Sequence, residues 1–224
     1  MSESPTVLRE WREVLSHPIP RYERPDISLI EENVTPYGVS LYIAGSKGAS
    51  NLDLLREHGI TTVVNCAVNL DFNFVRDEDD QREPGENAVP NGAGAVRYYK
   101  LGLVDGHGNP ETMMLAGYYL LRSALNQELP ERASYPRRER GNVLVNCRGG
   151  RSRSVALAGL FLHQSMPDKY PTLDDALQHV RVQRQLRPDE WIEAPKPMLV
   201  NAALQASKWI EYIGHDEPTR ANAS

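Results

Sequence analysis

The sequence of 224 residues predicts a three-layer α/β domain, in which a central, mostly parallel sheet is flanked by helices. Three observations lead to this prediction. Short apolar stretches alternate with segments of helical periodicity, and the last part of the chain is helical throughout. In addition, an apolar strand at 143–146 runs through a glycine-rich loop into an apolar helix. In such a fold the functional residues gather at the carboxyl ends of the strands.

The first half of the chain predicts three strands and one helix. Residues 39–44 alternate apolar and polar side chains, as in a strand with one buried face. Ser50 and Asp53 have the spacing of a capping box, so we expect a helix to begin there and to end at Gly59. Two more strands are expected, at 60–68 and 95–103.

Residues 69–94 interrupt this alternation. They are acidic at 77–83 and then rich in proline and glycine. A loop of this length is unusual inside a compact domain. We therefore expect a mobile insertion or a lid.

The second half predicts mainly helices. Asn109 and Pro110 should begin a helix that ends near residue 128, and an arginine-containing polar connection follows at 129–141. Thr172 and Asp175 have the spacing of a second capping box. Further helices are expected at 154–165, 172–184 and 197–213.

The length of the chain is enough for one domain with one core. We expect an N-terminal arm at 1–35, with a short helix at 7–15, because this stretch is rich in proline and charge. The catalytic domain should span 36–214. Residues 215–224 should form a C-terminal tail.

Composition excludes several classes of protein. The net charge of −5 argues against nonspecific nucleic-acid binding. We expect neither a signal peptide nor a membrane-spanning segment, because no apolar run approaches 18 residues. Two cysteines are too few for a disulfide framework and indicate a reducing cytoplasm. Six scattered histidines lack ligand spacing, so we expect no metal and no other cofactor. The oligomeric state stays open.

The loop after the strand at 143–146 carries the clearest chemical signal. A thiol has a pKa of about 8.5, so a nucleophilic Cys147 needs its thiolate stabilised. The N-terminus of the following helix, the convergent N–H groups of a glycine-rich turn and the cation of Arg153 would all do this. These same groups would also bind the oxygens of a phosphate ester placed above the sulfur. We expect its contacts to come from Arg148, Gly149, Gly150, Arg151 and Ser152.

The pattern Cys147-x5-Arg153-Ser154 between a strand and a helix resembles the signature of the cysteine-based protein phosphatases, and the compact length points to their dual-specificity branch. Residues 39–67 are similar to the opening strand, helix and strand of that branch, and the likeness covers roughly residues 36–205. The resemblance implies the three-layer cysteine-phosphatase fold. It also implies that Cys147 is the nucleophile, that Arg153 binds the phosphate and the transition state, and that Ser154 steadies the leaving thiolate.

One position departs from the family pattern. The family usually has a histidine directly before the cysteine, whereas this chain has Asn146. An asparagine side chain can still hydrogen-bond the loop backbone, but it cannot carry charge. We expect lower activity or a higher pKa of Cys147, and not a dead site.

Breaking a phosphate ester also requires a proton donor for the leaving oxygen. In the dual-specificity branch an aspartate from an upstream loop supplies it. Asp105 follows the strand at 95–103 in a glycine-rich loop and is our candidate. It would donate the proton first and then act as the base for the attacking water. An ordinary turn aspartate before Gly106 is the alternative.

These residues predict hydrolysis of phosphate monoesters through a phosphocysteine intermediate. Phosphotyrosine in a phosphoprotein is the preferred substrate, with phosphoserine and phosphothreonine as further substrates. Arg148 and Arg151 leave open a phosphoinositide or inositol-polyphosphate phosphatase. A noncatalytic phosphate-binding module would keep Arg153 but would need neither Cys147 nor Asp105. A sulfurtransferase would typically have a shorter loop and no upstream acid.

Overall fold

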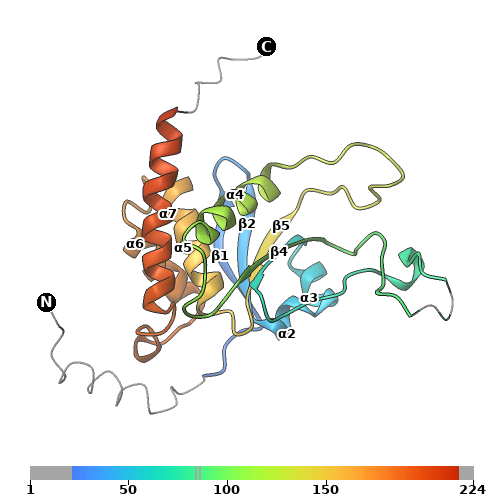
Figure 1. The fold of residues 1–224 in the computed structure, drawn as a ribbon, viewed down its shortest axis with the longest axis horizontal. Coiled ribbons are helices and arrows are strands. Elements are labelled where there is room, and N and C mark those ends of the chain that lie inside the picture. The colour runs from blue at the N-terminus through green and yellow to red at the C-terminus, as the bar shows by residue number, and fades with distance from the viewer. Residues whose placement is uncertain (1–21, 84, 86, 217–224) are drawn as a thin grey trace, which may run out of the picture.

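A computed structural model describes residues 22–83, 85 and 87–216, which form a central five-stranded sheet with helices packed against it (Figure 1). Strand β1 pairs antiparallel with β2, and the other neighbours run parallel in the order β1-β2-β5-β3-β4. The predicted mostly parallel sheet is therefore confirmed. The strands are β1 (Ile27–Val34), β2 (Val39–Ala44), β3 (Ile60–Ala67), β4 (Arg97–Leu103) and β5 (Asn142–Asn146).

The helices form two unequal layers. Two short ones, α2 (Ser46–Ala49) and α3 (Leu52–Glu57), pack against one face of the sheet. The larger layer, visible on the left of Figure 1, consists of α4 (Met113–Asn126), α5 (Arg153–Ser165), α6 (Leu173–Gln183) and α7 (Pro197–Asp216).

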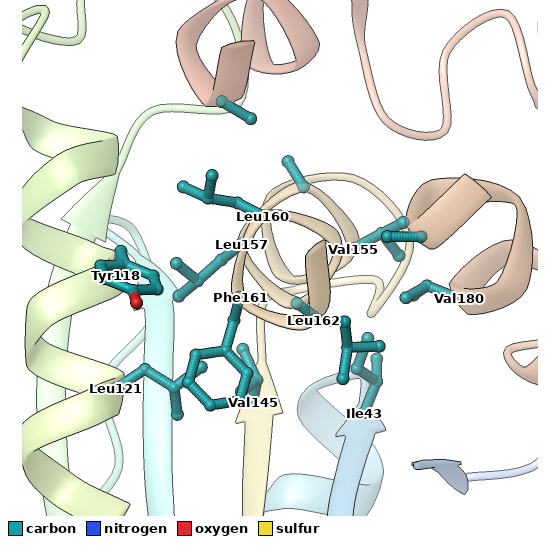
Figure 2. Close-up of a cluster of buried hydrophobic side chains, with 14 of the residues drawn as sticks. Ile43, Tyr118, Leu121, Val145, Val155, Leu157, Leu160, Phe161, Leu162 and Val180 are labelled. Carbon is teal, nitrogen blue, oxygen red and sulfur yellow. The ribbon is translucent and has the colours of Figure 1, made fainter. Parts of the chain in front are cut away.

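Two apolar cores, one on each face of the sheet, hold the layers together. Successive side chains of β5 point to opposite faces of the sheet, so Val143 and Val145 lie in the larger core and Leu144 lies in the smaller one. Helix α5 is buried from Arg153 to Leu162, because it lies between the sheet and the other helices of its layer. Figure 2 shows side chains of the larger core, among them Phe161, Leu157, Leu121, Val145 and Ile43.

The sheet begins earlier than expected. Residues 27–34, which we assigned to the arm at 1–35, form the edge strand β1. Ile27, Ile30 and Val34 are buried in it, so this stretch contributes to the core. The helix expected at 7–15 lies outside the described residues, as do residues 217–224 of the expected tail. Helix α7 extends to Asp216.

Local chemistry decided two helix starts differently from the prediction. Helix α3 is capped by Asn51, whose Oδ1 accepts the N–H groups of Asp53 and Leu54 at 3.1 Å, and not by Ser50. An asparagine one residue further on therefore takes the capping role.

The side chain of Asn109 bonds back to its own loop, where Oδ1 accepts the N–H of Val104 at 2.8 Å. Helix α4 consequently begins at Met113 and not at Pro110. The capping box of Thr172 and Asp175 at the start of α6 is confirmed.

The segment 69–94 lies beside the connection 129–141, on the side of the molecule away from α6 and α7 (Figure 1). An ion pair of 2.9 Å between Arg137 and Asp79 joins the two segments. Among its described residues, the segment 69–94 has a short 3₁₀ helix at Asp77–Asp79 and one bridge between Val75 and Gly94. Among the described residues of segment 69–94, Asn69 alone lines the cavity described below, so this segment does not cover the cavity in this conformation.

Candidate functional site

The candidate site lies where strand β5 ends and helix α5 begins. Asn146 is the last residue of β5, Cys147 follows, and a short loop leads to Arg153, the first residue of α5. The buried strand thus delivers Cys147 to the carboxyl edge of the sheet. Within the loop Gly150 has a φ of +62°, and a Cβ there would lie 2.5 Å from the carbonyl carbon of Ala44. The turn therefore requires glycine.

Cys147 is surrounded by groups that favour its thiolate. Its side chain is buried, and Sγ lies 3.3 Å from the hydroxyl oxygen of Ser154. Burial alone would raise the pKa of the Cys147 thiol. Hydrogen bonds from the hydroxyl and N–H of Ser154 and the N–H of Ser152, together with the charge of Arg153, outweigh burial and bring this pKa below its ordinary value.

The other cysteine has the opposite character. Cys66 is buried in β3, where burial and the neighbouring Cys147 raise the pKa of its thiol well above the ordinary value. Burial without hydrogen-bond donors to the sulfur keeps a thiol protonated and unreactive. The site therefore contains one activated thiol.

Arg153 is fixed by the strands beside it. Its side chain is 3 % exposed, and Nη1 donates to Oδ1 of Asn69 at 3.0 Å and to the carbonyl oxygen of Leu103 at 3.1 Å. The buried Nε–H has no hydrogen-bond partner among the described residues. Buried donors are almost always paired in proteins. Arg153 also lines the cavity that contains Cys147, so its cation favours an anion there.

Asp105 and Cys147 line the same cavity, which has a volume of about 670 Å³. The Asp105 side chain is 39 % exposed, so its carboxyl group meets both the cavity and solvent. Lys196 holds this loop, because its Nζ donates to the carbonyl oxygen of Asp105 at 2.9 Å and lies 3.8 Å from Oδ2. The structure thus brings the expected acid and the expected nucleophile together.

A second wall of the cavity comes from the segment before β1. Arg24 from this segment and Arg151 from the loop both reach the carboxylate of Glu190, at 2.6 and 3.3 Å. The Glu190 side chain is fully buried in the 3₁₀ helix Pro188–Glu190. One carboxylate therefore links the loop to a segment that is far away in the sequence.

Most of the predicted site residues meet in this cavity. Its lining includes Asp105, Cys147, Arg148, Gly149, Arg151, Ser152 and Arg153. Gly150 and Ser154 do not line it: Gly150 shapes the turn and Ser154 contacts the sulfur.

The cavity is also formed by residues that were not predicted from the sequence. These are Arg24, Asn69, Arg184, Glu190 and Lys196, all placed in or behind the walls of the cavity. They carry no motif of their own. Only folding brings them to the loop.

Asn146 differs from the expectation. Both polar atoms of its side chain are buried, and neither makes a hydrogen bond within the described part of the chain. The expected bond from this amide to the loop backbone is therefore absent. The side chain is enclosed at the end of a central strand, where the neighbouring backbone groups are already paired in the sheet.

Neither a cluster of metal-ligating side chains nor a membrane-spanning helix occurs among the described residues. No group of three histidine, cysteine, aspartate or glutamate side chains within 22–83, 85 and 87–216 is arranged to hold a metal ion. None of the helices in this part of the chain is long and apolar enough to cross a bilayer.

Comparisons with known proteins agree with the architecture. No protein-family model matches the chain, and no curated protein matches it in sequence. Human DUSP28 is similar in structure, with a TM-score of 0.52 and 18 % identity over 86 % of this chain and 99 % of that one. The Yvh1 phosphatase domain from Chaetomium thermophilum has a TM-score of 0.53 and 18 % identity, with the same coverage.

A third similar structure is the human tyrosine phosphatase-like serine/threonine/tyrosine-interacting protein. Its TM-score is 0.50, with 20 % identity over 77 % of this chain and 93 % of that one. All three likenesses extend over most of both chains. The chain therefore has the three-layer α/β fold of the dual-specificity phosphatases.

Proposed function

We propose that this protein hydrolyses phosphate monoesters, with Cys147 as the nucleophile. One observation carries the proposal: a thiol of lowered pKa and the largely buried cation of Arg153 line the same cavity. A structural cysteine would gain nothing from either feature. A noncatalytic phosphate reader would need the arginine but not the activated sulfur.

In the first step the Cys147 thiolate attacks phosphorus in line with the ester oxygen. The S–P bond forms and the P–O bond breaks, while Asp105 donates a proton to the leaving alcohol or phenol. Arg153 and the loop N–H groups stabilise the charge on the three equatorial phosphate oxygens. The product is phosphocysteine.

In the second step water attacks the phosphocysteine. Asp105, now a carboxylate, takes a proton from this water, the S–P bond breaks and inorganic phosphate is released. The hydroxyl of Ser154, 3.3 Å from Sγ, donates to the departing thiolate. Both steps use only residues of this chain, so the proposal involves no cofactor.

We propose phosphotyrosine in proteins as the substrate, with phosphoserine and phosphothreonine as further substrates. The similar structures support this class, because they include the Yvh1 phosphatase domain and a tyrosine phosphatase-like protein. The cation-rich cavity wall favours a second candidate, a phosphoinositide or inositol polyphosphate. We place the activity in the reducing cytoplasm, because a free thiolate nucleophile needs that environment.

The first experiment is hydrolysis of para-nitrophenyl phosphate by the full chain. We expect turnover by the wild type and none by Cys147→Ser. In the wild type, a phosphocysteine at position 147 should be detectable by mass spectrometry after the reaction is quenched with acid. Cys66→Ser is the matched control and should keep its turnover. Equal activity of wild type and Cys147→Ser would refute the proposed function.

A further inference from the structure

We propose that Lys196 is a positioning residue for the general acid: it holds the loop 104–110, and with it Asp105, in place at the cavity that contains Cys147. The inference rests on the proposed function, because the place of this loop matters only if Asp105 delivers a proton to the leaving oxygen. Lys196 is not among the residues that line the cavity, so its effect would pass through Asp105.

The loop 104–110 is held only weakly by packing. Most of its residues are exposed, and none of them is buried. Asn109 closes the loop on itself, because its Nδ2 donates to the carbonyl oxygens of Val104 and Gly106 at 2.9 and 3.2 Å. These bonds fix the shape of the loop but not its place relative to Cys147. A segment with few buried contacts opens easily, so an outside contact is needed to hold it.

Lys196 supplies that outside contact. Its Nζ donates to the carbonyl oxygen of Asp105 at 2.9 Å. In the described part of the chain, no other hydrogen bond joins the loop 104–110 to a segment beyond the strand and helix that flank it. The distance of 3.8 Å between Nζ and Oδ2 of Asp105 is a partly exposed ion pair, which contributes little by itself. The hydrogen bond to the backbone of the acid is therefore the contact that sets its place.

The backbone of Lys196 is itself fixed at both ends of the contact. Its N–H donates to Oγ of Ser152 at 3.3 Å, and Ser152 is a buried residue of the loop between β5 and α5. Its carbonyl oxygen accepts the N–H groups of Leu199 and Val200 in the first turn of α7, at 2.9 and 3.2 Å. Lys196 thus links the loop of Asp105 to the loop of Cys147. A misplacement of about 1 Å between reacting groups can cost a factor of about 10² in rate.

The test compares Lys196→Met with the wild type on two substrates that differ in their leaving group. The leaving group of phenyl phosphate is a phenol, as in phosphotyrosine, and needs the proton; that of para-nitrophenyl phosphate is already a stable anion. We expect kcat/KM to fall by about 10- to 100-fold for phenyl phosphate and to change little for para-nitrophenyl phosphate. Lys196→Gln, whose side chain is too short to reach Asp105, should show the same difference.

Two further variants are matched to this one. Lys196→Arg keeps a cationic donor at the position and should restore most of the activity on phenyl phosphate. Lys208→Met removes an exposed lysine of α7 and should behave as the wild type on both substrates. Loss of activity in Lys208→Met as large as in Lys196→Met would assign the effect to helix α7 and overturn the proposal.

A double-mutant cycle separates positioning from a general loosening of the fold. In an Asp105→Asn background, Lys196→Met should cause no further loss of kcat/KM for phenyl phosphate, because no acid remains to be positioned. A loss by the same factor in both backgrounds would show that Lys196 acts independently of Asp105 and would overturn the proposal. Thermal unfolding of each variant confirms that it is folded.

The two proposals fail in different ways. No turnover of para-nitrophenyl phosphate by the wild type refutes the proposed function. Turnover by the wild type, together with a Lys196→Met protein that keeps wild-type kcat/KM for phenyl phosphate or loses the same factor on both substrates, overturns the positioning role alone.

Discussion

Arg184 holds the loop between β5 and α5 through a hydrogen bond of 2.9 Å from its Nε to the carbonyl oxygen of Gly150. The arginine follows the last residue of α6 and is buried. Its Nη1 also donates to the carbonyl oxygen of Pro25 and the hydroxyl of Ser28, at 2.6 and 2.8 Å. Burial, with the nearby charge of Arg24, lowers the pKa of Arg184 to about 10, so the group remains charged at neutral pH.

Replacing Arg184 with methionine should weaken both the fold and the activity. The carbonyl groups of Gly150 and Pro25 would lose their donor, at a cost of about 1–3 kcal/mol for each buried group left unpaired. A loosened loop should also lower kcat/KM for para-nitrophenyl phosphate. Denaturant unfolding and steady-state kinetics measure the two effects.

Arg181→Met is the control for this variant. Arg181 is a partly buried arginine of the same helix that donates to the carbonyl oxygen of Ala194 and stacks on Trp191. The Arg181→Met protein should be less stable than the wild type but should not show a comparable loss of kcat/KM. An Arg184→Met protein as active as Arg181→Met would contradict the anchoring role.

Removing the Ser154 hydroxyl should raise the pKa of Cys147. Burial already favours the neutral thiol, and the hydroxyl is the largest of the groups that oppose it. In the wild type, alkylation by iodoacetamide should reach half its maximal rate at a pH below the ordinary thiol value of about 8.5. In Ser154→Ala the midpoint should move to higher pH, because less thiolate is present at neutral pH.

Cys66 should not interfere with this measurement, because it is buried and its pKa is well above the ordinary value. Cys147→Ser should therefore abolish alkylation of the folded protein. Identical pH midpoints for wild type and Ser154→Ala would show that the hydroxyl does not stabilise the thiolate.

Asp105→Asn should slow the first chemical step. Loss of a general acid typically costs a factor of about 10² to 10⁴. The loss of kcat should be large for phosphotyrosine and small for an aryl phosphate whose leaving group is already a stable anion. A variant that affects both substrates equally would assign Asp105 a structural role in its loop.

Asn146→Leu should stabilise the protein. The wild-type amide is buried with neither polar atom hydrogen-bonded among the described residues, and such a group costs about 1–3 kcal/mol. Leucine has a similar shape and no polar atom to satisfy. We expect a higher free energy of unfolding in urea, whereas an unchanged or lower one would contradict a net cost of the unpaired amide.

Much of this molecule could be predicted from the sequence, because its signals are local. Strand periodicity located Val39–Ala44 with the bounds found in the structure, and the pair Thr172 and Asp175 located the start of α6. Edge strand β1 was missed because its apolar residues follow a proline-rich, charged stretch, and pairing with β2 is what makes it a strand. Asn109 likewise gave a false helix start, because its side chain bonds within its own loop and accepts the N–H of Val104.

The sequence by itself determined the centre of the candidate site, because Cys147, the glycines, Arg153 and Ser154 are neighbours in one strand, loop and helix. The backbone of that turn sets their relative positions with little help from elsewhere. Only the tertiary structure decided what surrounds the centre. Arg24, Glu190 and Lys196 reach it from distant segments, and a long-range ion pair leaves no periodic pattern in the chain because its partners meet only after the sheet and helices have packed.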